Sequence, residues 1–76
     1  MQQMIQSTND IGQQIQSARK KQGLSQEELA MLANVGRRFV VELEQGKATA
    51  QIGKVLQVLH ALGLGVQVVS TWDTSS

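Results

Sequence analysis

The chain has 76 residues and a formal net charge of +1, which fits one small domain and by itself does not indicate a nucleic-acid ligand. Cysteine is absent, which excludes a disulfide framework and a thiolate metal site and fits a protein of the reducing cytoplasm. No apolar run reaches about 20 residues, and residues 1–6 lack the pattern of a signal peptide, so we expect no membrane span and no leader. All seven basic residues, however, lie between Arg19 and Lys54.

Two helices with capping residues are predicted in the first half of the chain. Ser7 can cap a helix over residues 8–22. One face of this helix carries the apolar residues Ile11, Ile15 and Ala18. Ser25 and Glu28 form the spacing of a capping box and begin a shorter helix over residues 26–33.

Two further helices are expected after a tight turn at Asn34, a residue type that tolerates positive φ. One covers residues 37–45 and ends at Gly46; the other covers residues 50–62, with Thr49 as its cap. The apolar residues expected to face the core from these helices are Val40, Leu43, Ile52, Val55, Leu56, Leu59 and Leu62. The fold class is therefore mainly α, with four to five short helices.

The C-terminal part of the chain changes to a β-branched composition. Residues 66–72 (VQVVSTW) alternate in part and predict one β-strand. A lone strand cannot satisfy its own backbone groups, so we expect it to pair with the same strand of a second copy through Val66, Val68 and Val69. The predicted organisation is an N-terminal arm (1–6), a helix-turn-helix domain (7–64), a dimerisation strand (65–72) and a tail (73–76).

Residues 24–47 carry the pattern that indicates function. A short capped helix, a turn of about four residues and a second short helix form a helix-turn-helix, whose second helix enters the DNA major groove. The small Ala30 allows the two helices to pack closely. Arg37 and Arg38 open the second helix, where cations oppose the helix dipole, and this local cost favours an external anion.

The segments LSQEELA (residues 24–30) and ELEQGK (residues 42–47) resemble the XRE/Cro-type family, which includes lambdoid phage repressors. The resemblance covers residues 8–64 and implies a lambda-repressor-like fold. A narrower similarity is to HipB-like antitoxins, the DNA-binding partners of HipA-type kinase toxins. It rests on GRRF (residues 36–39), on GKATA (residues 46–50) and on the C-terminal strand, which HipB-like proteins use to pair across a dimer.

The resemblance also implies roles for individual residues. Gln26 corresponds to a family glutamine that contacts the DNA backbone, and Arg37 and Arg38 stand where the family reads bases. Arg19 and Glu44 match a structural ion pair beneath the recognition helix. The remaining positions implied on the DNA side are Val41, Glu42 and Lys47.

Several positions allow two interpretations. Phe39 departs from the small polar residue common in the family, and it could pack beneath the recognition helix or touch a thymine methyl group. Met31 and Leu32 could widen the core or form an exposed patch for a partner, and we favour the core. Trp72 could cover the dimer strand or meet a partner. The DNA-side residues that could instead be ordinary solvated residues are Gln26, Lys47 and above all Glu42.

The sequence thus predicts a repressor that binds double-stranded DNA at an inverted-repeat operator as a homodimer. The similarity to HipB implies autoregulation of a toxin–antitoxin operon with a HipA-like kinase as partner. The alternatives are a protein-interaction module that mainly neutralises a toxin, and a stand-alone phage-type repressor. Because the chain has one histidine and no cysteine, and is too small for a buried site, we expect no metal, no cofactor and no enzymatic activity.

Overall fold

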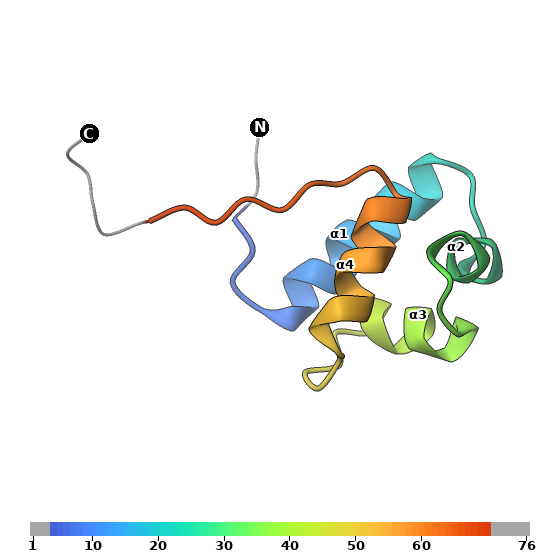
Figure 1. Cartoon of the computed structure of the whole chain (residues 1–76), viewed down its shortest axis with the longest axis horizontal. Helices are drawn as coiled ribbons and strands as arrows, with labels where there is room; N and C mark the ends of the chain where they lie inside the picture. Colours follow the sequence, from blue (N-terminus) through green and yellow to red (C-terminus); the bar gives the residue numbers. More distant parts are fainter. Residues whose placement is uncertain (1–3, 71–76) are drawn as a thin grey trace.

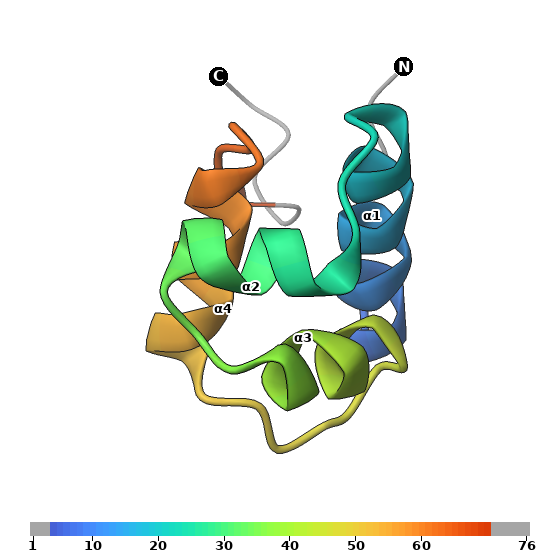
Figure 2. The same cartoon turned by 90° about the vertical axis from the view of Figure 1, so that its right-hand side faces the viewer.

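Four α-helices form the computed structural model, which describes residues 4–70. They are α1 (Thr8–Lys21), α2 (Gln26–Ala33), α3 (Arg37–Glu44) and α4 (Ile52–Ala61). Figure 2 shows α1 and α4 on opposite sides of the molecule, with α2 crossing between them and α3 below α2. The four predicted helices and the mainly α fold are confirmed, and each helix end lies within two residues of its expected place.

The first two helices begin at the predicted capping residues. Ser7 Oγ accepts a backbone N–H from the first turn of α1 at 3.1 Å. Ser25 and Glu28 make the complete capping box, with Ser25 Oγ accepting from the Glu28 N–H at 3.0 Å and Glu28 Oε1 accepting from the Ser25 N–H at 2.8 Å. The predicted cap at Thr49 is wrong, because α4 begins after Gln51 and Thr49 lies in the turn before it.

The core is built from residues of all four helices. Its buried apolar members are Ile15, Leu29, Ala30, Ala33, Val40, Leu43, Val55, Val58, Leu59 and Leu62. In α4 the predicted apolar face is confirmed at Val55, Leu59 and Leu62, which are buried. Ile52, on the first turn, is an exception at 69% exposed, and Val58 is fully buried although it was not predicted. The preference for Met31 and Leu32 as core residues is also wrong: they are 75% and 61% exposed. They lie opposite the buried face of α2, and a helix of 8 residues buries one face only.

Helices α1 and α3 approach each other closely at Gly12. A Cβ atom at this position would lie 2.5 Å from the carbonyl oxygen of Leu43 and 2.8 Å from that of Glu44. Glycine is therefore the residue that allows the end of α3 to rest against α1. A hydrogen bond stabilises the same contact: Thr8 Oγ1, at the start of α1, donates to the carbonyl oxygen of Gly46, just after α3, at 2.8 Å.

The Gly12→Ala substitution should lower the free energy of unfolding by about 1–3 kcal/mol. Its methyl group would overlap backbone atoms of α3, which cannot move aside by rotating a side chain. Gly53→Ala is the matched control, since a Cβ at this α4 position meets nothing within 4 Å. This control should be stabilised by up to about 1 kcal/mol, as is usual for Gly→Ala in a helix. Urea titrations followed by circular dichroism compare the two variants. A Gly12→Ala protein as stable as the parent chain would contradict the close approach.

Residues 64–70 have no regular secondary structure. Leu64 still packs against the core, and the segment after it extends beyond the helices (Figure 1). Val66, Val68 and Val69 are 58%, 94% and 49% exposed. The predicted strand is thus not found in the described part of the chain, and the positions expected at its end, Thr71 and Trp72, lie outside the described residues. The physical reason is that a strand exists through hydrogen bonds to a neighbouring strand, and residues 4–70 contain no second extended segment paired with this one.

Candidate nucleic-acid interface

The turn between α2 and α3 has the geometry that a helix-turn-helix requires. Asn34 ends α2 in the left-handed conformation, with φ 59° and ψ 45°, as predicted for this residue. The N–H of the next residue, Val35, donates to the carbonyl oxygen of Ala30 at 3.0 Å and closes the helix end. Ala30 is 3% exposed, so α2 and α3 pack closely at this position. The opposite side of α3, which begins with Arg37 and Arg38, faces solvent.

The first turn of α3 exposes two arginines. Arg38 Nε lies 3.4 Å from Glu42 Oε2, and its side chain remains 91% exposed. Within residues 4–70, no hydrogen bond or ion pair joins the Arg37 side chain to another residue. This turn contains no acidic residue and no side-chain cap, so both cations face the positive end of the helix dipole. An external acceptor, such as the O6 and N7 atoms of guanine, would compensate this charge.

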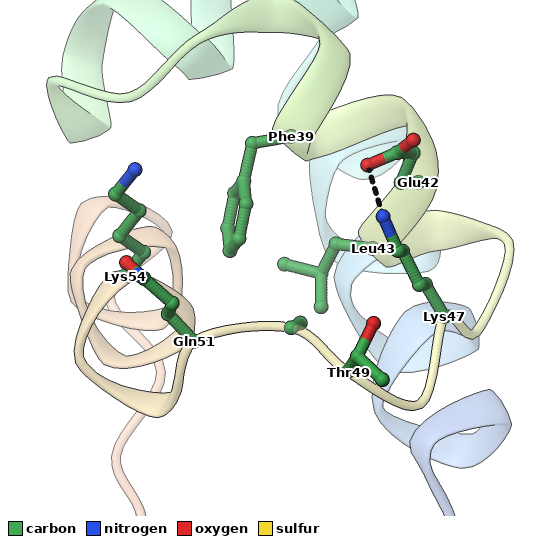
Figure 3. A pocket seen from close by; sticks show the side chains of 8 residues that line it. Phe39, Glu42, Leu43, Lys47, Thr49, Gln51 and Lys54 are labelled. Carbon is green, nitrogen blue, oxygen red and sulfur yellow. Dashed lines mark hydrogen bonds and ion pairs between the residues drawn. The ribbon is translucent and has the colours of Figure 1, made fainter.

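Glu42 and Lys47 are joined at the other end of α3 (Figure 3). Gly46 has φ +85° and turns the chain back, so that the N–H of Lys47 donates to the carbonyl oxygen of Glu42 at 3.1 Å. This reversal also brings Lys47 Nζ to 3.1 Å from Glu42 Oε1. The hydrogen bond from Lys47 lowers the pKa of Glu42 below its usual 4.5, with the charge of Arg38 adding to the effect and partial burial opposing it.

The carboxylate of Glu44 is the centre of a buried polar network. Arg19 Nε donates to Glu44 Oε2 at 2.6 Å and Arg19 Nη2 to Oε1 at 3.0 Å, which is a two-point contact. The Arg19 and Glu44 side chains are 10% and 2% exposed. Hydrogen bonding to Glu44 raises the pKa of Arg19, and the burial of the guanidinium opposes this effect. The ion pair that the resemblance implied is therefore present, and it joins α1 to the end of α3.

Gln26 belongs to the same network. Its Nε2 donates to Glu44 Oε1 at 3.1 Å, which ties the first residue of α2 to the last residue of α3. A contact between Gln26 and the DNA backbone would therefore use its own backbone N–H at the helix N-terminus, or the second N–H of the amide. Through this bond Gln26 also helps to hold the angle between α2 and α3.

Phe39 and Lys54 form the wall of a small hollow between α3 and α4, which Figure 3 shows together with Glu42 and Lys47. The Phe39 ring is half-buried against the core, and Lys54 Nζ lies 5.8 Å from the ring centroid. Of the two interpretations of Phe39, the structure thus shows packing. The sequence analysis did not single out Lys54, because a lysine near the start of a helix gives no local signal that its side chain lies beside another helix.

These features define a class of protein: a small helix-turn-helix domain with an exposed, arginine-bearing recognition helix. The sequence pattern of the family described as "Helix-turn-helix" matches residues 15–69. An "Uncharacterized HTH-type transcriptional regulator y4mF" of Sinorhizobium fredii (strain NBRC 101917 / NGR234) is 53% identical over 66 residues, which cover 87% of each chain. The chain therefore belongs to the XRE-type helix-turn-helix family of DNA-binding transcriptional regulators, which is not a class of enzymes.

Solved structures of HipB have the same fold. The chain in a HipB–O4 20mer complex has a TM-score of 0.84 and 18% identity, with coverage of 92% of this chain and 99% of that one. A chain in a HipA–HipB–O2–O3 complex also has a TM-score of 0.84, at 20% identity and the same coverage. The predicted similarity to HipB is confirmed by this likeness, which at such identities concerns the fold.

Residues 4–70 also lack two further features, a membrane span and a metal site. None of the helices there is both long and apolar enough to cross a membrane, and the longest of them has 14 residues. The same residues contain no group of three or more histidine, aspartate or glutamate side chains arranged to hold a metal ion.

Proposed function

We propose that this protein is a repressor that binds an inverted-repeat operator as a homodimer, with α3 in the major groove. The observation that carries the proposal is the exposed first turn of α3, where Arg37 has no partner within residues 4–70 and Arg38 is 91% exposed. The buried Arg19–Glu44 pair supports it, because this pair holds α3 in place from behind and so limits the motion of the arginines.

The proposed contacts divide into positioning and reading. Lys47 and the N–H groups at the start of α2, beginning with Gln26, would contact phosphates and set the register. Arg37 and Arg38 would read guanine through the forked guanidinium group. Val41 lies one turn further along α3, where an apolar side chain can touch a thymine methyl group.

The proposed dimer places the two recognition helices in successive major grooves, about 34–36 Å apart. We assign the pairing to residues 65–72, between the helix-turn-helix domain (7–64) and the tail (73–76), with residues 1–6 as an arm. The support is the exposure of Val66, Val68 and Val69, whose apolar surface a second copy would cover. The second copy would also supply backbone partners for residues 66–69, which make no backbone–backbone hydrogen bond within the described part of the chain.

Deleting residues 66–76 should convert a dimer into a monomer, because the paired segment is lost while the helical core is kept. Sedimentation velocity over a range of protein concentrations measures the change, and circular dichroism verifies that the helices remain. The matched control deletes residues 73–76 alone and should leave the dimer intact. A 1–65 chain that still sediments as a tight dimer would rule out this pairing.

We further propose that the protein is the antitoxin of a HipA-type kinase, which the fold likeness to HipB supports. A second candidate function, neutralisation of a toxin as the main role, is favoured by Met31 and Leu32, which expose apolar surface on α2. Co-expression with the kinase of an adjacent gene, followed by purification through a tag on this chain, tests the partnership. Recovery of this chain without the kinase would contradict both the antitoxin role and toxin neutralisation as the main role.

The first experiment is a binding titration with the DNA upstream of the protein's own gene and with a scrambled duplex, at two salt concentrations. We expect tighter binding to the upstream DNA at both concentrations, because base contacts persist when phosphate contacts are screened. Equal and strongly salt-dependent binding to the two duplexes would contradict sequence-specific repression and would shift the weight to the partner-binding role.

A further inference from the structure

The exposed side of α3 holds one carboxylate between two cations. Glu42 Oε1 is 3.1 Å from Lys47 Nζ, and Glu42 Oε2 is 3.4 Å from Arg38 Nε, so each oxygen has its own partner. The Lys47 side chain is 49% exposed and that of Glu42 is 31% exposed, which leaves the three groups within reach of a ligand at the surface. The backbone also keeps them together, since Lys47 is folded back onto Glu42 by the turn at Gly46.

This arrangement makes DNA binding an exchange of partners. Lys47 and Arg38 are partly neutralised by Glu42 in the free protein, and a phosphate or base that recruits either cation must compete with this carboxylate. When α3 enters the groove, Glu42 loses water and is brought near the negative charge of the duplex. A carboxylate in that position is costly unless a hydrogen-bond donor meets it.

The major groove offers two such donors among the bases, the N4 amino group of cytosine and the N6 amino group of adenine. Adenine carries the N7 acceptor beside its amino group, and this lone pair repels a carboxylate. On its major-groove edge cytosine carries the C5–H group beside N4 and no acceptor, so it is the better partner of the two.

We propose that Glu42 is a specificity-determining residue that accepts a hydrogen bond from the N4 amino group of a cytosine in each half-site, and that it withholds Lys47 and Arg38 from DNA lacking that cytosine. The inference rests on the proposed function, because it requires α3 to lie in the major groove. It assigns a reading role to a residue type that at a helix surface is usually only solvated.

The Glu42→Gln variant tests this role with little change in shape. Its affinity for a scrambled duplex should rise, because Lys47 and Arg38 are released, and the salt dependence should steepen by about one phosphate contact. Its preference for cytosine at one position of the half-site should fall by on the order of tenfold. The measurement is a competition titration with duplexes in which each base pair of the half-site is replaced in turn by the other three.

Glu27→Gln is the matched control. Glu27 is an exposed carboxylate in the first turn of α2, and its replacement changes the net charge of the protein by the same amount. It should alter affinity for all duplexes alike and leave the base preference at every position unchanged.

The outcomes separate the two proposals. Equal binding of the unmodified protein to upstream and scrambled DNA would overturn the proposed function, whatever Glu42→Gln does. Selective binding by the unmodified protein, with the same base preferences in Glu42→Gln, would overturn the role of Glu42 alone. A preference that is lost at an adenine and not at a cytosine would overturn the assignment to N4.

Discussion

Replacement of Glu44 by alanine should lower the free energy of unfolding by about 3–5 kcal/mol, the largest change in stability that we expect from one substitution. Arg19, whose side chain is 10% exposed, would be left as a buried cation without its carboxylate. Gln26 would lose its acceptor in the same step. A domain of this length has about 4–11 kcal/mol of stability in all, at about 0.05–0.15 kcal/mol per residue, so much of the variant would be unfolded near physiological temperature.

The double variant Arg19→Met, Glu44→Leu is the informative comparison. It removes both charges and fills their space with apolar groups, an exchange that is often close to neutral. We expect it to regain most of the stability that Glu44→Ala loses. The remaining deficit comes from two lost hydrogen bonds, the one that Arg19 Nη1 donates to the carbonyl oxygen of Leu24 at 2.8 Å and the one that Gln26 Nε2 donates to Glu44. Thermal and urea unfolding of the three proteins supply the test. A Glu44→Ala midpoint equal to that of the unmodified chain would show that the pair contributes nothing to stability.

Replacement of Arg37 by alanine should weaken operator binding by about 1–3 kcal/mol and relax the base preference at one position of each half-site. Arg37 is the arginine of the α3 first turn without an intramolecular partner in residues 4–70, so its guanidinium is free to contact a base. Binding to scrambled DNA should fall much less, because the loss concerns base reading more than phosphate contact. Fluorescence anisotropy with a set of single-base-pair operator variants measures both quantities.

Two control variants separate the effect of the positive charge from that of base recognition by the guanidinium group. Arg37→Lys keeps the charge and loses the planar fork, so it should retain non-specific affinity and lose guanine preference. Lys21→Ala removes one cation at the last residue of α1, outside the helix-turn-helix, and should leave the base preference unchanged. An unaltered specificity profile for Arg37→Ala would show that the part of α3 assigned to the groove is wrong.

The elements that were predicted correctly depend on residues close together in the chain. The capping box of Ser25 and Glu28 spans three residues, and the positive φ of Asn34 and Gly46 is a property of the residue itself and its turn. The XRE-type resemblance added the ion pair beneath α3, which no local pattern indicates. The predicted C-terminal strand is not found because a strand is held by hydrogen bonds to a neighbouring strand, and residues 4–70 contain none beside this segment. Ile52 was assigned to the core of α4 because periodicity alone does not say which helix turn the other helices cover.

The sequence by itself therefore determined the four helices, the turn between α2 and α3 and the arginines at the start of the recognition helix, since these follow from local backbone preferences and spacing. The tertiary structure decided that Gly12 is the contact between α1 and α3, that Gln26 bonds to Glu44 and that Lys54 lies over Phe39. Each of these contacts joins residues on different helices, and their geometry exists only after the helices have packed into one core.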